Sequence, residues 1–426
     1  MAKSVVSIAK GTDAEKLVEE ALSLLGGVTS LIKPNSTVVV KPNAGHPVPP
    51  ERSGCTSPAV VAAVIKELRK AQPKEIILAE ASARGCDTLE CFEVSGIGKA
   101  AEDAGADRII DIKRDKDLIS IPIRDAKSDL TRVLLPRFLV EADHIVNLPL
   151  FKAHVAMIFT CALKNLKGVV QDKVHYEMHQ TDLGLAMVDL FSVAKPDLSI
   201  ADMIHPAEGF GEASQMPVDF GCIVASKDPV ALDTTACRMV GLPVDKVHYF
   251  QSAQERGLGN VAEKQIEIRG RTIEEVFQQL WFPYMEGYEQ WPEYNIDTEG
   301  ACSSCLGTLG AVFERLKFLG EYEKNAGITI LTGRKKEIPE GIPRKDLILI
   351  GNCLKKYRDR GILVEGCPPG GGSGNPVYAI VNREEQIPGQ DMKRTAATTE
   401  AEAKAWRDYQ VKLREKWLSQ RQGRKS

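Results

Sequence analysis

The sequence predicts an α/β protein whose main sheet is mostly parallel and carries helices on both faces. Apolar runs rich in β-branched residues alternate along the chain with segments of helical spacing. The strand-like runs are apolar almost throughout, which is typical of a sheet buried on both faces. The chain has 426 residues, too many for one ordinary core, so two or three domains are expected.

The first half of the chain supplies these alternating elements. Segment 36–41 is a β-branched run that Pro42 ends, which predicts a buried strand and then a loop over 41–50. A helix is expected from Pro58, because proline favours the first helical turn and the preceding hydroxyl residues favour the N-cap. Further strands are expected at 5–8, 75–80 and 106–111, and further helices at 13–25 and 96–104.

Polar residues follow several of these strands, at the position where parallel α/β sheets bind ligands. A lysine beside apolar strands tends to lose its charge unless an anion meets it, so several such lysines predict a pocket for a carboxylate or phosphate. The predicted catalytic residues are Lys152, His154, Lys164 and Asp202. The predicted substrate-binding residues are Lys41, Asn43, Asn165, Asp228 and Asp233. Each residue alone could equally be a helix cap or a surface ion pair, and their recurrence after strands favours function for the set.

Residues 38–241 resemble the family known as domain of unknown function 362. The motifs that carry the resemblance have the family's order and spacing: Lys41-Pro42-Asn43, Thr56-Ser57-Pro58, Asn147-Leu-Pro149 with Lys152 and His154, Thr160 with Leu163-Lys164-Asn165 and Gly168, Ile200-Ala-Asp202, and Asp228-Pro229-Val-Ala-Leu-Asp233. This resemblance covers about half of the chain. It implies a fold and a site but no reaction, and members of the family often carry an added iron–sulfur portion.

Composition and charge narrow the class of protein. The net charge of −3 argues against a specialist for nucleic acids or membrane surfaces. The apolar run at the start is too short for a signal peptide, and no stretch approaches the roughly 20 apolar residues of a membrane span. We therefore expect a cytoplasmic protein with no nucleic-acid partner. In that compartment the ten cysteines are expected to be thiols or metal ligands rather than disulfides.

Four of these cysteines fall within one short α/β stretch. Cys302 and Cys305 precede a predicted helix over 306–319, and strands are predicted at 327–332, 346–350 and 362–364. Cys353 and Cys367 follow the last two strands. Thiolates bind soft metals and iron–sulfur clusters, and four of them make a complete ligand set. The positive end of a helix also favours thiolates and an anionic cluster. The stretch therefore predicts a 4Fe-4S cluster.

Zinc is the main alternative for these four thiolates. A structural zinc site usually has two close Cys-x-x-Cys knuckles, whereas here the second pair is divided between two strand ends, which favours the cluster. A redox dithiol at Cys302 and Cys305 would leave the other two cysteines unexplained. A second metal site stays open, because three more cysteines lie near predicted loops: Cys55, Cys86 and Cys91.

The cysteine stretch resembles the proximal-cluster site of nickel–iron hydrogenase small subunits and of the related complex I subunit. The shared features are a Cys-x-x-Cys, a Gly-x-Cys after a strand and a final Gly-Cys-Pro-Pro, here Gly351-Asn-Cys353 and Gly366-Cys367-Pro368-Pro369. The order agrees and the intervening lengths are shorter. The resemblance implies a 4Fe-4S cluster and does not imply hydrogenase activity.

These observations divide the chain into four parts with different roles. They are an α/β body over 1–250, a connecting segment over 251–298, a small α/β cluster domain over 299–390 and an amphipathic helix over 391–426. We expect an anaerobic iron–sulfur oxidoreductase or electron-transfer protein that acts on a small anionic metabolite bound by the body.

Two alternatives to this function stay open. They are a non-redox isomerase or lyase with a structural cluster, and a non-enzymatic, cluster-carrying scaffold or maturation factor. Four cysteine ligands leave no open iron position, which favours electron transfer or a structural role over Lewis-acid chemistry. A redox partner protein and a homo-oligomer are both compatible with the sequence.

Overall fold

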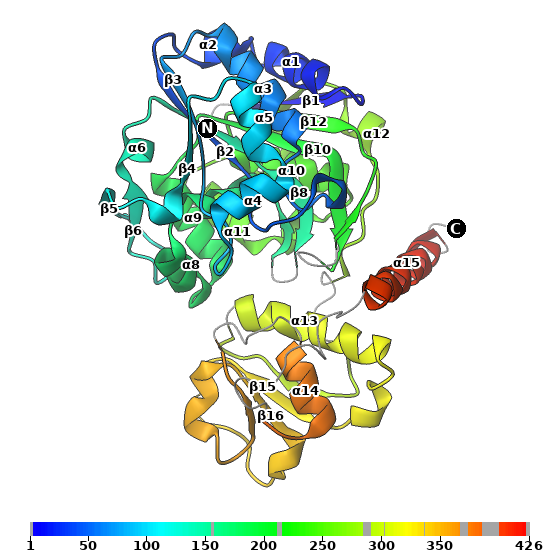
Figure 1. Cartoon of the computed structure of the whole chain (residues 1–426). Helices are drawn as coiled ribbons and strands as arrows, with labels where there is room; N and C mark the ends of the chain where they lie inside the picture. Colours follow the sequence, from blue (N-terminus) through cyan, green and yellow to red (C-terminus); the bar gives the residue numbers. More distant parts are fainter. Residues whose placement is uncertain are drawn as a thin grey trace. The chain divides into compact units, whose positions relative to one another are not determined.

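Two units make up the chain in the computed structural model of the protein (Figure 1). The first comprises residues 1–153 and 159–282, and the second comprises residues 154–158 and 283–426. The structure describes residues 3–154, 157–210, 215–283, 291–301, 303–335, 337–366, 374–385 and 400–422. Each unit has its own main sheet.

The first unit alternates strands and helices along most of its length. Its strands are β1 (Ser4–Lys10), β2 (Thr37–Pro42), β3 (Glu75–Glu80), β4 (Arg108–Asp111), β5 (Leu118–Pro122), β6 (Arg132–Pro136), β7 (His144–Leu148), β8 (Leu150–His154), β9 (Ile158–Thr160), β10 (Leu198–Gly209), β11 (Gln215–Pro217), β12 (Cys222–Ser226) and β13 (Ile266–Gly270). Its helices are α1 (Ala14–Leu24), α2 (Val28–Leu31), α3 (Pro58–Lys70), α4 (Thr88–Ser95), α5 (Ile97–Asp103), α6 (Arg137–Val140), α7 (Ala162–Asn165), α8 (Asp172–His179), α9 (Leu183–Val193), α10 (Pro229–Met239), α11 (His248–Glu255) and α12 (Ile273–Val276).

The main sheet has the strand order β13-β1-β12-β10-β7-β2-β3-β4. Among the described strands of this path, β12 alone runs antiparallel to both of its neighbours. The chain builds outward from β2 in both directions, because β3 and β4 lie on one side of β2 and β7 and β10 lie on the other. The border between β2 and β7 is therefore a topological switch point, where sheets of this kind bind ligands beyond the carboxyl ends of the strands.

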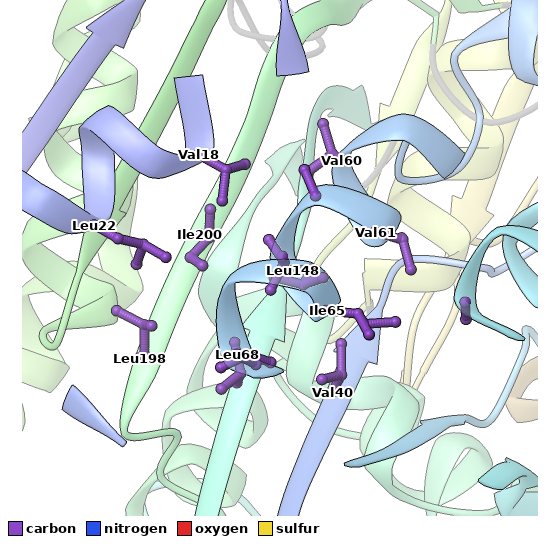
Figure 2. Close-up of a cluster of buried hydrophobic side chains, with 14 of the residues drawn as sticks. Val18, Leu22, Val40, Val60, Val61, Ile65, Leu68, Leu148, Leu198 and Ile200 are labelled. Carbon is purple, nitrogen blue, oxygen red and sulfur yellow. The ribbon is translucent and has the colours of Figure 1, made fainter. Parts of the chain in front are cut away.

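Helices α1 and α3 cover one face of the sheet. Figure 2 shows side chains of both helices pointing toward alternate residues of β2, β7 and β10. The labelled residues of this core are Val18, Leu22, Val40, Val60, Val61, Ile65, Leu68, Leu148, Leu198 and Ile200. Residues in between, such as Asn147 and Ser199, face the opposite side, where α7 lies against β7 and α10 lies against β12. The predicted α/β class with a mostly parallel sheet is confirmed.

Part of the predicted connecting segment over 251–298 is built into the first unit. Residues 266–270 form β13, which pairs in parallel with β1 at the edge of the sheet. Helix α12 ends at Val276, because the backbone N–H groups of Gln278 and Leu280 donate instead to carbonyls at the end of α10. The connecting role predicted for this segment therefore does not describe its first part.

The second unit has a four-stranded parallel sheet. Its strands are β14 (Asn295–Asp297), β15 (Thr329–Thr332), β16 (Leu347–Ile350) and β17 (Ile362–Val364), in that order across the sheet. Its helices are α13 (Ser303–Phe318), α14 (Gly374–Asn382) and α15 (Glu400–Gln422). The residues of α13 at helical spacing are buried against this sheet: Leu309, Val312, Phe313 and Leu316.

The C-terminal helix packs on α13 through aromatic side chains. The rings of Trp406 and Tyr409 lie 5.1 and 5.5 Å from the ring of Phe318, and the hydroxyl of Tyr409 donates to Glu314. The predicted helix over 391–426 is described over residues 400–422. Within the described parts of the chain, no helix combines the length and apolar character that a membrane span needs.

Candidate functional site

A buried ion pair lies at the carboxyl ends of β2 and β3. The Nζ atom of Lys41 is 2.8 Å from Oε2 of Glu80, and the two residues are only 1% and 2% exposed. The Lys41 ammonium also donates to the carbonyl of Pro42 (2.7 Å) and to Oδ1 of Asn165 (3.2 Å). The Glu80 carboxylate accepts further hydrogen bonds from the backbone N–H groups of Ala44 and Ala81, both at 3.0 Å. Every charge of this pair is therefore met by groups of the chain itself.

Burial perturbs both partners in the direction that disfavours charge. It lowers the pKa of Lys41, and Glu80 opposes that effect. It raises the pKa of Glu80, and the hydrogen-bonded Lys41 ammonium opposes that effect. Each partner and its hydrogen bonds therefore offset part of the loss of water that burial imposes on the other.

Three asparagine side chains extend this network across the switch point. Asn165 accepts from Asn43 Nδ2 (3.1 Å) and donates to Asn147 Oδ1 (2.8 Å). Asn147 donates in turn to the carbonyl of Ala162 and to the hydroxyl of Ser199. The side chains come from β7, α7 and the loop after β2, so this network fastens α7 to the strand ends.

Gly168 packs directly against the ion pair and lies in the 3₁₀ turn over Leu166–Val169. A Cβ atom at this position would lie 1.7 Å from Oε1 of Glu80 and 2.6 Å from Nζ of Lys41. The carbonyl of Gly168 also accepts from the N–H of Ala81 (2.8 Å). Only glycine lets the backbone approach the ion pair this closely.

Lys152 lies near the network, on β8. Its Nζ donates to the carbonyl of Gly54 at 2.6 Å, and the side chain is 5% exposed. Its positive charge lowers the pKa of Lys41 further and opposes the burial that raises the pKa of the Cys55 thiol. His154 ends β8, and its Nδ1 accepts from the N–H of Met157 (3.2 Å). Residues 154–158 group with the second unit.

The three predicted aspartates all bind backbone N–H groups at helix starts. Asp202 accepts from Ser57 at the start of α3 (2.8 Å), and Asp228 accepts from Val230 and Ala231 at the start of α10. Asp233 accepts from Ala162 (2.7 Å) and Leu163 (3.0 Å), where α7 begins.

Burial disfavours the charged form of two of these aspartates, Asp202 and Asp233. It raises the pKa of Asp202 and raises that of Asp233 to about 7, while the backbone donors act the other way. All three carboxylates thus have a geometric role as caps, which was one of the two interpretations that the sequence left open.

A second group of polar residues surrounds His175 on α8. Burial and the positive charges of Lys167, Lys113 and Lys164 lower the pKa of His175 to about 3. Its Nε2 donates to the carbonyl of Lys167 (2.6 Å), and Nδ1 is buried without a hydrogen-bond partner among the described residues. Asp172 is the nearby carboxylate, 3.0 Å from the ammonium of Lys113. Three lysines thus lower the pKa of this imidazole, and Nζ of Lys167 also lies 2.5 Å from Nε2 of His179.

The sequence interpretation gave no site role to Glu80 or to the residues around Lys164, and it quoted Gly168 only as part of a family motif. Glu80 had a recognisable signal, because it is an acidic residue at the end of an apolar strand. Lys113, Lys167 and His175 gave no such signal, because the two lysines come from 3₁₀ turns and His175 comes from a short helix.

The two described cysteines of the second unit, Cys305 and Cys353, lie at the carboxyl edge of its sheet. Cys305 lies in the first turn of α13, which follows β14, and Cys353 follows β16. A Cβ atom at Gly351 would lie 3.2 Å from the sulfur of Cys305 and 3.5 Å from that of Cys353. Both sulfurs thus lie close to one point beside Gly351, which stays open because residue 351 has no side chain. Cys302 and Cys367 lie outside the described residues.

The loops that lead to the other two cysteines are tied to the same edge. Asn352 donates its N–H to the carbonyl of Gly366 (3.1 Å), and its Oδ1 accepts from the N–H of Gly366 (2.9 Å). These two residues immediately precede Cys353 and Cys367. Before Cys302, the carbonyl of Gly300 accepts from the N–H of Arg334 in the loop after β15 (3.0 Å). Across the described residues, no three His, Cys, Asp or Glu side chains are grouped as a metal ion would need.

Comparison with known proteins finds a family match in the first unit of the chain. Residues 38–238 match the family described as Domain of unknown function (DUF362). The family match predicted for residues 38–241 is confirmed. The ion pair, the asparagine network and the group around His175 all lie inside this DUF362 region, and the four cysteines of the second unit lie outside it.

A curated protein and two solved structures are similar to the chain more broadly. The chain is 28% identical over 255 residues to the thylakoid-associated protein sll1697 of Synechocystis, which covers 57% of this chain and 74% of that protein. A structure of the lactate racemase apoprotein from Thermoanaerobacterium thermosaccharolyticum is 12% identical, with a TM-score of 0.43, and covers 94% of this chain and 91% of its own. A protein from Thermotoga maritima is 14% identical, with a TM-score of 0.38, and covers 90% of this chain and 94% of its own.

Proposed function

We propose that the protein binds a 4Fe-4S cluster through Cys302, Cys305, Cys353 and Cys367 and is an iron–sulfur redox protein for a small anionic metabolite. The cluster belongs to the second unit and the metabolite site to the DUF362 region. The observation that carries the proposal is that the sulfurs of Cys305 and Cys353 lie within 3.2 and 3.5 Å of the same point beside Gly351.

The donor set fits an iron–sulfur cluster in its chemistry. Cluster iron is held by cysteine thiolates, and a tetrathiolate set is the usual one for 4Fe-4S. The hydrogen bonds between Asn352 and Gly366 support convergence of the loops that carry Cys353 and Cys367. When bound, the cluster would supply one-electron redox capacity.

The first turn of α13 contributes electrostatically to such a site. Cys305 lies in this turn of a 16-residue helix, where exposed N–H groups and the helix dipole favour negative charge. Cys305 is 2% exposed, so its thiolate needs that compensation more than an exposed thiolate would. Zinc could use the same four sulfurs, and metal analysis distinguishes the two.

The anionic metabolite is assigned to the group around His175. Lys164 and Lys167 bring positive charge to an imidazole that burial keeps neutral, and its buried Nδ1 can accept a hydrogen bond from a protonated ligand group. Lysine ammonium groups bind carboxylates and phosphates through charge-assisted hydrogen bonds. Lys41 is less suited to this role, because its ammonium is already bonded to Glu80, Pro42 and Asn165.

The alternative with acid–base chemistry is supported less well by the predicted catalytic residues. Asp202 already accepts two backbone hydrogen bonds and caps α3, so it is better explained as a structural residue. Lys152 is buried and bonded to the carbonyl of Gly54, so it would need to change partners to transfer a proton. Electron transfer needs neither change.

Anaerobic purification with iron, sulfide and zinc analysis tests the cluster. We expect about four iron and four sulfide per chain, as for any 4Fe-4S site, and an EPR signal in the reduced protein. Cys305→Ala and Cys353→Ala should lose most of the iron, while Cys222→Ala, in β12 of the first unit, should retain it. A colourless protein with stoichiometric zinc would refute the cluster.

A second measurement tests the metabolite site independently of the cluster. Oxalate and inorganic phosphate serve as probes in calorimetric titrations of the cluster-loaded protein. Lys164→Gln with Lys167→Gln should weaken probe binding at least about tenfold, because each removes a charge-assisted contact. Lys173→Gln is the matched control, because Lys173 is an exposed lysine on α8, the helix that carries His175. Unchanged binding in the double variant would remove the group around His175 from the proposal.

A further inference from the structure

A cavity of about 420 Å³ opens at the end of the first unit's sheet where the parallel strands begin, opposite to the end that carries the ion pair. Its wall includes Ser4 at the start of β1 and Ser226 at the end of β12. Because β12 runs antiparallel to its neighbours, its carboxyl end reaches the edge where the parallel strands begin. The volume is within the range of roughly 300–1,000 Å³ that is typical of small-molecule sites.

Positive charge dominates the wall of this cavity. Its charged members are Lys3, Lys195, Lys227, Arg269 and Asp228. Arg269 is paired with Glu267 at 2.7 Å. No carboxylate in the described parts of the chain forms an ion pair with any of the three lysines. The contact given for Lys195 is with the ring of Phe191, whose centroid is 6.0 Å from Nζ.

The one carboxylate of the wall is occupied by neutral donors. Asp228 accepts from the hydroxyl of Ser4 (2.6 Å), from the N–H of Asn260 (2.8 Å), and from two N–H groups at the start of α10. Through these bonds Asp228 caps α10 and connects β1 to the loop over 257–260. Gly259 lies so close that a Cβ atom there would be 2.4 Å from Oδ1 of Asp228. Three lysines therefore line the cavity with a single carboxylate, and no ion pair among the described residues joins that carboxylate to any of them.

We propose that this cavity binds a multiply charged phosphate compound, such as a small organic phosphate or pyrophosphate. A monocarboxylate would leave two of the three lysines without a counter-charge, whereas a phosphate group of charge near −2 matches the excess. The volume exceeds what a lone phosphate needs, and Val5, Leu25 and Leu258 supply an apolar part of the wall for an organic portion. This site is separate from the one assigned to the metabolite, because it lies at the other edge of the sheet.

Calorimetric titration with inorganic pyrophosphate at low ionic strength tests the assignment, with the full chain as the protein. Wild type should bind pyrophosphate, and Lys195→Gln with Lys227→Gln should weaken binding at least about tenfold. Lys264→Gln, an exposed lysine of the same unit that does not line the cavity, should leave binding unchanged. All these lysines are exposed, so thermal midpoints should agree among the variants and exclude misfolding as the cause.

The double variant of Lys164 and Lys167 separates the two anion sites. Pyrophosphate binding that persists in that variant and is lost in the Lys195 and Lys227 variant supports the cavity. Binding that is lost only in the Lys164 and Lys167 variant overturns the cavity and leaves the metabolite site intact. No binding by wild type, or tighter binding of citrate than of pyrophosphate, overturns the phosphate assignment.

Discussion

Removing the charge of Glu80 should destabilise the first unit strongly. Glu80→Gln leaves the Lys41 ammonium, which is 1% exposed, with neutral hydrogen-bond acceptors only. Breaking a buried ion pair by neutralising one partner costs about 3–5 kcal/mol, because the remaining charge stays buried without compensation. That is a large part of the roughly 5–15 kcal/mol by which a domain is usually stable.

The double replacement Lys41→Met with Glu80→Leu gives a different expectation. It removes both charges but leaves the N–H of Ala44 without its acceptor, while Ala81 still donates to Gly168. One unsatisfied buried donor costs about 1–3 kcal/mol, so the double variant should be more stable than Glu80→Gln. Glu15→Gln is the surface control: it removes the carboxylate paired with Lys66 and should cost less than about 1 kcal/mol.

Hydrogen exchange followed by mass spectrometry measures this effect locally. A chain of two units need not unfold in one step, so exchange of peptides that contain β2 and β3 reports on the relevant unit better than a single melting curve does. A Glu80→Gln protein whose β2 and β3 exchange free energies fall by less than about 1 kcal/mol would refute the proposed cost of the unpaired lysine. If the double variant is less stable than Glu80→Gln, the ion pair contributes more to stability than its two charges lose by being buried.

Three further predictions concern close contacts and pH. Gly168→Ala should destabilise the first unit by at least about 3 kcal/mol, measured by the same exchange experiment, because its Cβ would overlap Oε1 of Glu80; an effect within about 0.5 kcal/mol would contradict that overlap. The pKa of His175 is about 3 in the folded chain against an ordinary 6.5, so the unfolded chain takes up this proton first and the free energy of unfolding falls as pH falls from 6.5 to 3. Urea unfolding of His175→Gln should show a smaller loss of stability over this pH range. Asp233 has the opposite sign: its pKa is about 7 when folded against an ordinary 3.8, so stability is lost as pH rises through that interval, and Asp233→Asn should flatten this part of the profile. Parallel pH profiles for either variant and wild type would show that the residue does not titrate as described.

One prediction concerns the cluster. Gly351→Ala places a Cβ within 3.2 Å of the Cys305 sulfur and requires a φ of +104°, so bound iron per chain should fall while the exchange of β16 changes little. Full iron content in that variant would show that the space beside Gly351 is not needed for the cluster.

The sequence was informative wherever a short pattern determines the structure. The β-branched run before Pro42 is β2, the apolar spacing of Leu309 to Leu316 is the buried side of α13, and Cys353 follows β16 as expected. These features depend on residues a few positions apart, which periodicity and capping rules describe well.

The partners of the polar residues could not be read in the same way. Lys41 and Glu80 are 39 positions apart, and Asp233 caps a helix that starts 71 positions before it. Such contacts are set by how the strands and helices assemble, which single-chain patterns do not specify. The sequence therefore identified Lys41, Asn165 and the aspartates as a set but could not say that most of their polar atoms bind groups of the same chain.

The reversed direction of β12 lets the two edges of the sheet change independently. A strand of five residues spans roughly 17 Å, so the cavity residues after Ser226 and the ion pair after β2 are separated by about the depth of the sheet. Substitutions that reshape one edge need not disturb hydrogen bonds at the other. Two ligands could be bound at once without competing for space, and a protein engineer could alter the specificity of the cavity while keeping the Lys41 network that holds the strands together.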